Sequence, residues 1–171
     1  MTSPEPADAD IRRRKLLGVG LRADLISRAD VARDVSLTVT ETGTDLAVVE
    51  GFDNLCQDLE VGLTTLRGSD VFNQQFGFLG LSPLTSQTSP VLAREGVRAA
   101  VAEFLVSDPR VRQITDVQLD NPMGDPPGRW RRTLAVRVAF NTITGETAAI
   151  SGVGLASDKS WGAVETTGTG S

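Results

Sequence analysis

The chain has 171 residues, with 22 acidic and 17 basic side chains, a formal net charge of −5 and a pI near 4.8. This acidic balance argues against a dedicated nucleic-acid-binding protein, which needs a basic face to displace counterions. The sequence has no histidine and one cysteine, which excludes imidazole zinc sites, Ser-His-Asp or Cys-His catalysis, and an intrachain disulfide.

The first segment, residues 1–15, is predicted to be a disordered lead. It is rich in proline, alanine and acidic residues, and ends in a basic cluster from Arg12 to Lys15 that we interpret as solvated. The apolar run that follows is interrupted by Gly18 and Gly20, so it predicts neither a secretory signal nor a membrane span. The pattern up to residue 33 is irregular, and we expect synthesis in the cytoplasm.

A β-hairpin is predicted between residues 35 and 49. Val35, Leu37 and Val39 alternate with polar residues, which is the period of a half-buried strand. Residues 41–45 have the composition of a turn, and apolar residues resume at 46–49.

An amphipathic helix is predicted next, because apolar residues recur at spacings of three and four. Cys56 falls on its apolar side and is interpreted as a small buried hydrophobic residue. Gly68 can adopt the positive φ that ends a helix. Residues 69–90 are predicted to be a long ordered loop, a kind of segment that often carries contacts. The apolar stripe of the helix comprises Phe52, Leu55, Leu59, Leu63 and Leu66.

A second helix is predicted to begin at Ser89–Pro90, where serine suits the N-cap and proline the first turn. It ends before Asp108–Pro109, because a residue preceding proline resists the helical conformation. Strands are predicted at 111–119 and 131–140, with a weaker one at 148–153 and a wide connection through 121–128. The residues that this helix is expected to bury are Val97, Ala100, Val101, Phe104 and Leu105, and those on one face of the second strand are Leu134, Val136, Val138 and Phe140.

This order of elements predicts an α+β domain over residues 16–155. It would have a small antiparallel sheet, two main helices packed on one face, and extended termini. Residues 156–171 are rich in glycine, serine and threonine and are predicted to be a flexible tail.

Three stretches of the sequence resemble the baseplate wedge family of contractile phage tails, typified by gene product 25 of the large myophages. Its relatives occur in contractile injection systems. The first stretch resembles the Asn-hydrophobic-x-Gln motif that opens a helix in this family. The second resembles the family's Leu-x-Thr-x-x-Gly turn, which is followed by a Phe-Gly pair. The third resembles its Glu-Pro-Arg-Ile motif, with aspartate in place of glutamate. The matching residues are Asn54 and Gln57, then Thr65, Gly68, Phe76 and Gly77, and last Asp108, Pro109, Arg110 and Val111.

The resemblance implies a non-enzymatic structural component of a baseplate, which attaches and starts the contractile sheath around the inner tube. It implies sheath subunits, other wedge proteins and tube or spike hub proteins as partners, with several copies in a ring and assembly in the bacterial cytoplasm. From the composition and the motif spacing of the sequence we expect no cofactor, no metal, no nucleic acid and no membrane insertion. Since contractile sheaths are linked by strands passed between subunits, we expect the strand near 131–140 or that near 148–153 to pair with another chain.

The resemblance also places a contact of the assembled baseplate on Asp108 to Val111, and we interpret all ten matching residues as candidates for the assembly interface. Arg110 carries five donors in a planar fork and can hold a carboxylate or several carbonyls of a neighbouring chain. Alternatively, Asp108 and Arg110 only cap the helix and pair locally. Arg110→Ala separates the two: it leaves the isolated fold nearly unchanged in the first case and unfolds it in the second.

Two other functions are considered. An adaptor of an unrelated assembly shares the fold class but has different partners. A lysozyme-like hydrolase needs two carboxylates about 5–10 Å apart, and the candidate pairs are Glu95 with Glu103 and Asp53 with Glu60. Each pair spans about two helical turns, or roughly 11–12 Å, which is too long for a retaining enzyme and does not favour catalysis.

Overall fold

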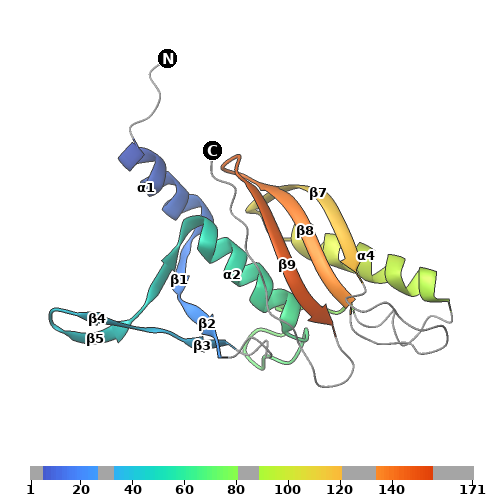
Figure 1. Ribbon diagram of the computed structural model, residues 1–171, viewed down its shortest axis with the longest axis horizontal. Helices are drawn as coiled ribbons and strands as arrows, with labels where there is room; N and C mark the ends of the chain where they lie inside the picture. The colour runs from blue at the N-terminus through green and yellow to red at the C-terminus, as the bar shows by residue number, and fades with distance from the viewer. Residues whose placement is uncertain (1–5, 27–32, 81–88, 121–133, 156–171) are drawn as a thin grey trace, which may run out of the picture.

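The computed structural model describes residues 6–26, 33–80, 89–120 and 134–155 of the chain. A three-stranded sheet with two helices forms one part, and a set of short β-ribbons with an N-terminal helix forms the other (Figure 1). The helices are α1 (Pro6–Leu17), α2 (Gly51–Thr64) and α4 (Pro90–Val106). The strands are β1 (Val19–Leu21), β2 (Ala23–Leu25), β3 (Arg33–Val35), β4 (Leu37–Thr40), β5 (Gly43–Leu46), β6 (Val48–Glu50), β7 (Val111–Asp120), β8 (Leu134–Thr142) and β9 (Thr147–Leu155).

The larger sheet is antiparallel, in the order β7-β8-β9. The turn between β8 and β9 is closed by hydrogen bonds from Thr142 N to Glu146 O (2.8 Å) and from Gly145 N to Thr142 O (3.0 Å). Gly145 has φ 90°, a conformation that glycine adopts without strain. Both edges of β8 are paired, so of the two strands expected to accept another chain, the one near 131–140 is ruled out. β9 lies at the edge of the sheet.

One face of this sheet is covered by α2 and α4 (Figure 1). Val136, Val138 and Phe140 alternate along β8 and are fully buried against the helices, as the period of two requires. Phe78 packs edge-on against Phe104, with ring centroids 6.1 Å apart. The predicted α+β class with two helices on one face is confirmed. From the helices the core receives Leu55, Leu59, Leu63, Val97, Val101 and Leu105, with Ala100 and Phe104 partly buried.

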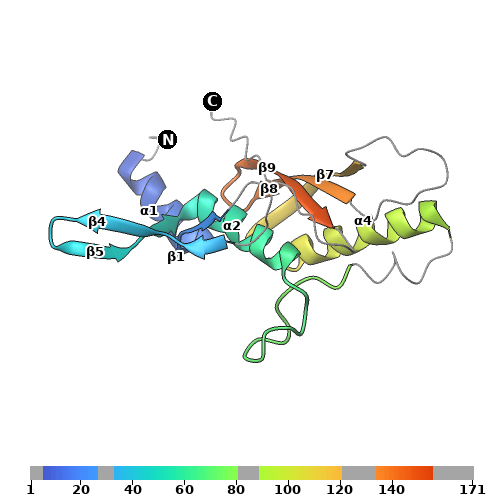
Figure 2. The same cartoon turned by 60° about the horizontal axis from the view of Figure 1, so that its bottom comes forward.

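Three short two-stranded ribbons, β1–β6, β2–β3 and β4–β5, meet in a three-way junction. Three backbone hydrogen bonds form a cycle there: Arg22 N donates to Ala47 O (2.9 Å), Ala47 N to Ser36 O (2.8 Å) and Ser36 N to Arg22 O (2.8 Å). Each of these residues is thus both donor and acceptor, so the junction leaves none of the six backbone groups unpaired. The β4–β5 hairpin projects from the junction, away from the larger sheet (Figures 1 and 2).

The structure corrects the prediction of a disordered lead over residues 1–15 for residues 6–15, while residues 1–5 lie outside the described part. Residues 6–17 form α1, with Asp8 in its first turn and basic side chains in its last turn, charges that suit the helix dipole. The helix is anchored because Leu17 is fully buried against α2, and it ends at Gly18, where φ is 91°. A basic last turn followed by glycine was the signal that could have revealed this helix.

The predicted hairpin exists, but it is not half-buried. All residues of β4 and β5 are exposed, because no other element of the described chain covers either face of this ribbon. Its turn is also shorter than predicted, since β5 begins at Gly43. Leu66 lies beyond the end of α2 and is exposed. The predicted tail at 156–171, and the parts of the predicted loops within 81–88 and 121–133, lie outside the described residues.

Candidate functional site

The turn between α4 and β7 holds the Asp108-Pro109-Arg110 segment. The Arg110 guanidinium grips the Asp108 carboxylate with two bonds, Nε to Oδ1 (3.0 Å) and Nη2 to Oδ2 (2.7 Å). The Arg110 backbone N–H also donates to Asp108 Oδ1 (2.9 Å). This bidentate contact fixes the guanidinium plane and aims its remaining nitrogen, Nη1, away from the turn.

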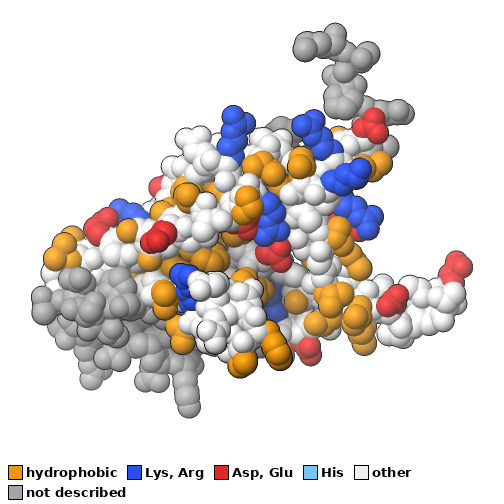
Figure 3. All heavy atoms as spheres, turned by 180° about the vertical axis from the view of Figure 1, so that it is seen from behind, with side chains coloured by type: hydrophobic (Ala, Val, Ile, Leu, Met, Phe, Trp, Pro, Cys, Tyr) orange, Lys and Arg blue, Asp and Glu red, His pale blue; other side chains and the backbone are white. Residues whose placement is uncertain are grey.

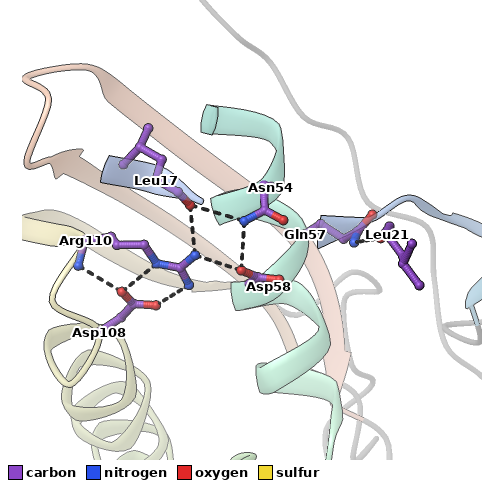
Figure 4. A network of polar contacts seen from close by, with 7 residues as sticks. All are labelled: Leu17, Leu21, Asn54, Gln57, Asp58, Asp108 and Arg110. Carbon is purple, nitrogen blue, oxygen red and sulfur yellow. Dashed lines mark hydrogen bonds and ion pairs between the residues drawn. The ribbon is translucent and has the colours of Figure 1, made fainter. Parts of the chain in front are cut away.

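Arg110 Nη1 reaches two other elements of the fold (Figure 4). It donates to Asp58 Oδ2 on α2 (2.8 Å) and to the carbonyl oxygen of Leu17 at the end of α1 (3.0 Å). Asn54 Nδ2, one turn before Asp58, donates to the same two oxygens, each at 3.2 Å. The network therefore ties together α1, α2 and the α4–β7 turn.

Gln57, the next residue of α2 that takes part, connects α2 to the N-terminal segment (Figure 4). Its Nε2 donates to the carbonyl of Leu21 (2.8 Å), and its Oε1 accepts from the backbone N–H of Ala23 (2.9 Å). A side-chain amide that bonds a C=O and the N–H two residues later acts as a strand partner, because it offers the same donor and acceptor as a backbone. Asn54 and Gln57 thus fasten the N-terminal segment to α2.

Partial burial strengthens the network. The side chains of Arg110 and Asp108 are 22% and 16% exposed, while that of Asp58 is 42% exposed. Burial alone would raise the pKa of Asp108, but the hydrogen bonds and positive charge of Arg110 outweigh it and lower the pKa. Conversely, the bond to Asp108 raises the pKa of Arg110. One guanidinium faces two carboxylates, and both acids hold it in its charged form.

A second group of predicted residues lies after α2. Thr65 O accepts from Phe78 N (2.8 Å), and the side-chain hydroxyl of Thr65 donates to Val61 O (2.7 Å). Gly77 has φ 105°, and a Cβ there would lie 2.6 Å from the carbonyl oxygen of Thr65. Only glycine allows the two backbone segments to approach this closely. Gly68 also has positive φ (84°), but in a turn four residues after the end of the helix rather than at its cap.

Residues of both groups line an open groove of about 960 Å³. The first group contributes Gln57 and Asp108 to Arg110, the second contributes Phe76 and Gly77, and residues of α4 also line it. Nine of the ten predicted residues fall into one of the two groups. Arg110 binds Asp108 directly and shares its other two acceptors with Asn54, so these three residues belong to one network. Val111 is instead a buried core residue.

Arg110 makes its hydrogen bonds inside the chain. Four of its five N–H groups are used, by Asp108, Asp58 and Leu17. This geometry matches the interpretation of local pairing more closely than that of a fork free to hold a neighbouring chain. Sequence reasoning missed Asp58, although its position four residues after Asn54 places it on the same helix face.

The carboxylates considered for hydrolysis lie in different surroundings. Glu95 is exposed and pairs with Arg98 (3.1 Å), and Glu103 is exposed on the same helix. Asp53 is exposed, whereas Glu60 is buried and pairs with Arg33 from β3. Burial raises the pKa of Glu60 more than Arg33 lowers it.

Within the described residues, no group of three or more Cys, Asp or Glu side chains is placed to hold a metal ion. None of the helices in the described ranges is both long and apolar enough to cross a bilayer. A scan against models of known protein families finds no match for this sequence, and a search of curated proteins finds no similar chain.

Proposed function

We propose that this chain is a non-enzymatic structural subunit of the baseplate of a contractile tail or contractile injection system, where it starts the sheath. The observation that carries the proposal is the open outer edge of β9. This strand is nine residues long and, within the part of the chain that the structure describes, pairs only with β8. An open edge of this length can accept a strand from another chain by β-augmentation.

The hairpin geometry identifies the groups that would bind such a strand. Thr142 and Glu146 form a hydrogen-bonded pair at the turn. Because hydrogen-bonded and non-hydrogen-bonded pairs alternate along an antiparallel ladder, the pair of Phe140 and Ala148 is hydrogen-bonded as well. Ala149 lies in the intervening, non-hydrogen-bonded pair with Ala139. Its N–H and C=O therefore point to the open edge and are available to a partner.

The polar network supports the resemblance on which the proposal also rests. Asn54 belongs to the first resembling stretch and Arg110 to the third, yet both donate to the Leu17 carbonyl and the Asp58 carboxylate. Asp108, also of the third stretch, holds Arg110 in place. A shared structural task explains why these stretches occur together at their spacing. The proposed partners are sheath subunits as strand donors, with wedge and tube or spike hub proteins around them, in a particle assembled in the bacterial cytoplasm.

The test is electron microscopy of particles from cells that lack the gene and are complemented with variants. Wild-type protein should restore sheathed particles. Ala149→Pro should yield naked tubes or baseplates without sheath, because proline removes the outward N–H while the bonds to β8 remain. Ala149→Val is the matched control, since it keeps the N–H and a strand-forming side chain, and circular dichroism melting checks that both variants fold.

Two results would contradict the proposal at different levels. Fully sheathed particles without the gene would remove the sheath-starting role, and an adaptor of another assembly would take its place. Sheathed particles with folded Ala149→Pro, where the gene is required, would mean that the sheath does not pair with β9.

A further inference from the structure

The β4–β5 hairpin, residues 37–46 and here named the arm, carries an uncovered apolar face. Leu37 lies directly opposite Leu46, and Val39 opposite Thr44, so these four side chains share one face of the ribbon. Leu37, Val39 and Leu46 are 66%, 86% and 45% exposed. Seen from behind, hydrophobic side chains gather around the base of the arm (Figure 3). An apolar face on a projecting ribbon marks an interaction surface.

The charge of the arm restricts what can bind it. The charged residues of the arm are Glu41 in its turn and Asp45 on its reverse face, and the arm has no lysine or arginine. A ribbon with this net negative charge is attracted to a cationic surface rather than to a second arm. The complementary partner is therefore a segment that combines apolar side chains with cations.

The α1 helix presents such a segment. Asp8, Ile11, Arg12, Lys15 and Leu16 lie at helical spacing on one side of it and line a shallow hollow of about 380 Å³. Ile11 and Leu16 are 53% and 39% exposed. Among the described residues, Arg12 and Lys15 form no ion pair, whereas the other two cations of the cluster pair with acids of the same chain.

We infer that the arm of one copy docks on this α1 stripe of a second copy. The apolar side chains of the arm would cover Ile11 and Leu16, while Glu41 in the turn of the arm would lie near Arg12 and Lys15. Asp45, on the reverse face of the ribbon, would add to the negative charge of the arm. Within one chain, α1 and the arm leave the body in different directions (Figures 1 and 2), so the contact is made between copies. Such a contact joins two different surfaces and builds a ring or a chain of copies.

This inference goes beyond the proposed sheath contact, because it uses neither β9 nor the polar network. If copies of the chain do not associate through the arm, the proposal that β9 binds a sheath strand is unaffected. If that proposal fails, association through the arm can still be tested separately. The full-length chain alone is sufficient for the test.

Sedimentation velocity over a concentration series measures the association. The wild-type chain should form oligomers that weaken as salt increases, since the contact includes exposed charges. The arm variant Glu41→Lys/Asp45→Lys and the helix variant Arg12→Glu/Lys15→Glu should each weaken self-association at least tenfold. Charge reversal of Glu95 and Glu103 on α4 alters the net charge as much as the arm variant does and should leave association unchanged.

Mixing the two variants is the decisive step. The basic arm of one then meets the acidic helix of the other, and both unlike contacts are restored, so the mixture should associate as the wild type does. Misfolded variants would not recover on mixing. A monomeric wild-type chain at all concentrations, or variants that fail to recover although each is folded, would overturn the inference, as would an arm that binds only a different basic protein.

Discussion

Replacing Arg110 by alanine removes four side-chain hydrogen bonds that join three elements of the fold. Two go to Asp108, one to Asp58 and one to the carbonyl of Leu17. Asn54 still satisfies the carbonyl and Asp58, and Asp58 is exposed enough for water to compensate it. Asp108, largely buried, loses its cation. Bonds to charged groups contribute about 1.5–3 kcal/mol, so we expect a net loss of about 2–3 kcal/mol.

The assay is urea unfolding of the purified chain, followed by circular dichroism, with the free energy of unfolding extrapolated to water. Arg110→Lys keeps the charge but loses the bidentate fork, so it should cost about half as much. Arg98→Ala is the matched control, because this exposed arginine pairs, among the residues that the structure describes, with Glu95 alone. Its loss should stay below about 0.5 kcal/mol.

A change of less than about 0.5 kcal/mol for Arg110→Ala would refute the reasoning. The network would then contribute nothing to the isolated fold, and its geometry would have to serve a contact with another chain. A loss of the expected size favours the local-pairing interpretation of Asp108 and Arg110.

Three further predictions concern single positions. Gly77→Ala should lower the unfolding free energy by more than about 2 kcal/mol in thermal unfolding, because a Cβ there clashes with backbone, while Gly68→Ala, with positive φ but open space, should cost about 1 kcal/mol. Cys56 should resist a colorimetric thiol reagent until denaturant is added, because burial raises the pKa of its thiol to about 12. Burial also raises the pKa of Glu60, so the contribution of the Glu60 carboxyl group to the free energy of unfolding falls as pH rises through that pKa. In denaturation curves between about pH 4 and 7, the stability of Glu60→Gln relative to the wild type should therefore increase with pH.

The elements with a clear apolar period could be predicted from the sequence. The α2 and α4 helices and the strands β7 and β8 follow their periodicity because each buries one face in the shared core. The weaker strand predicted at 148–153 lies within β9. The arm has the period of a half-buried strand, but its apolar face meets no part of the described chain. An alternation of apolar and polar residues shows only that one face of a strand is suited to burial. It does not show that another part of the same chain packs against that face.

The candidate site could be predicted only in part. The residues Asn54, Asp108 and Arg110 were singled out. That Asn54 and Arg110 both donate to the Leu17 carbonyl was not predicted, since this acceptor is a backbone atom with no sequence signature. Arg110 lies 93 positions from Leu17, and contacts at this separation depend on how the elements pack. The three-way junction was missed for the same reason, because its bonds join backbone groups.

The cyclic junction of Arg22, Ser36 and Ala47 makes the hairpin a separable module. Its three bonds all lie at the root of the ribbon, so residues added in pairs to β4 and β5 leave the register at the root unchanged. The hairpin can thus be lengthened, shortened or exchanged for an epitope or a fluorescent tag without redesign of the body. Natural relatives with the same root should vary most in the length and tip sequence of this ribbon, where insertions have the least effect on folding.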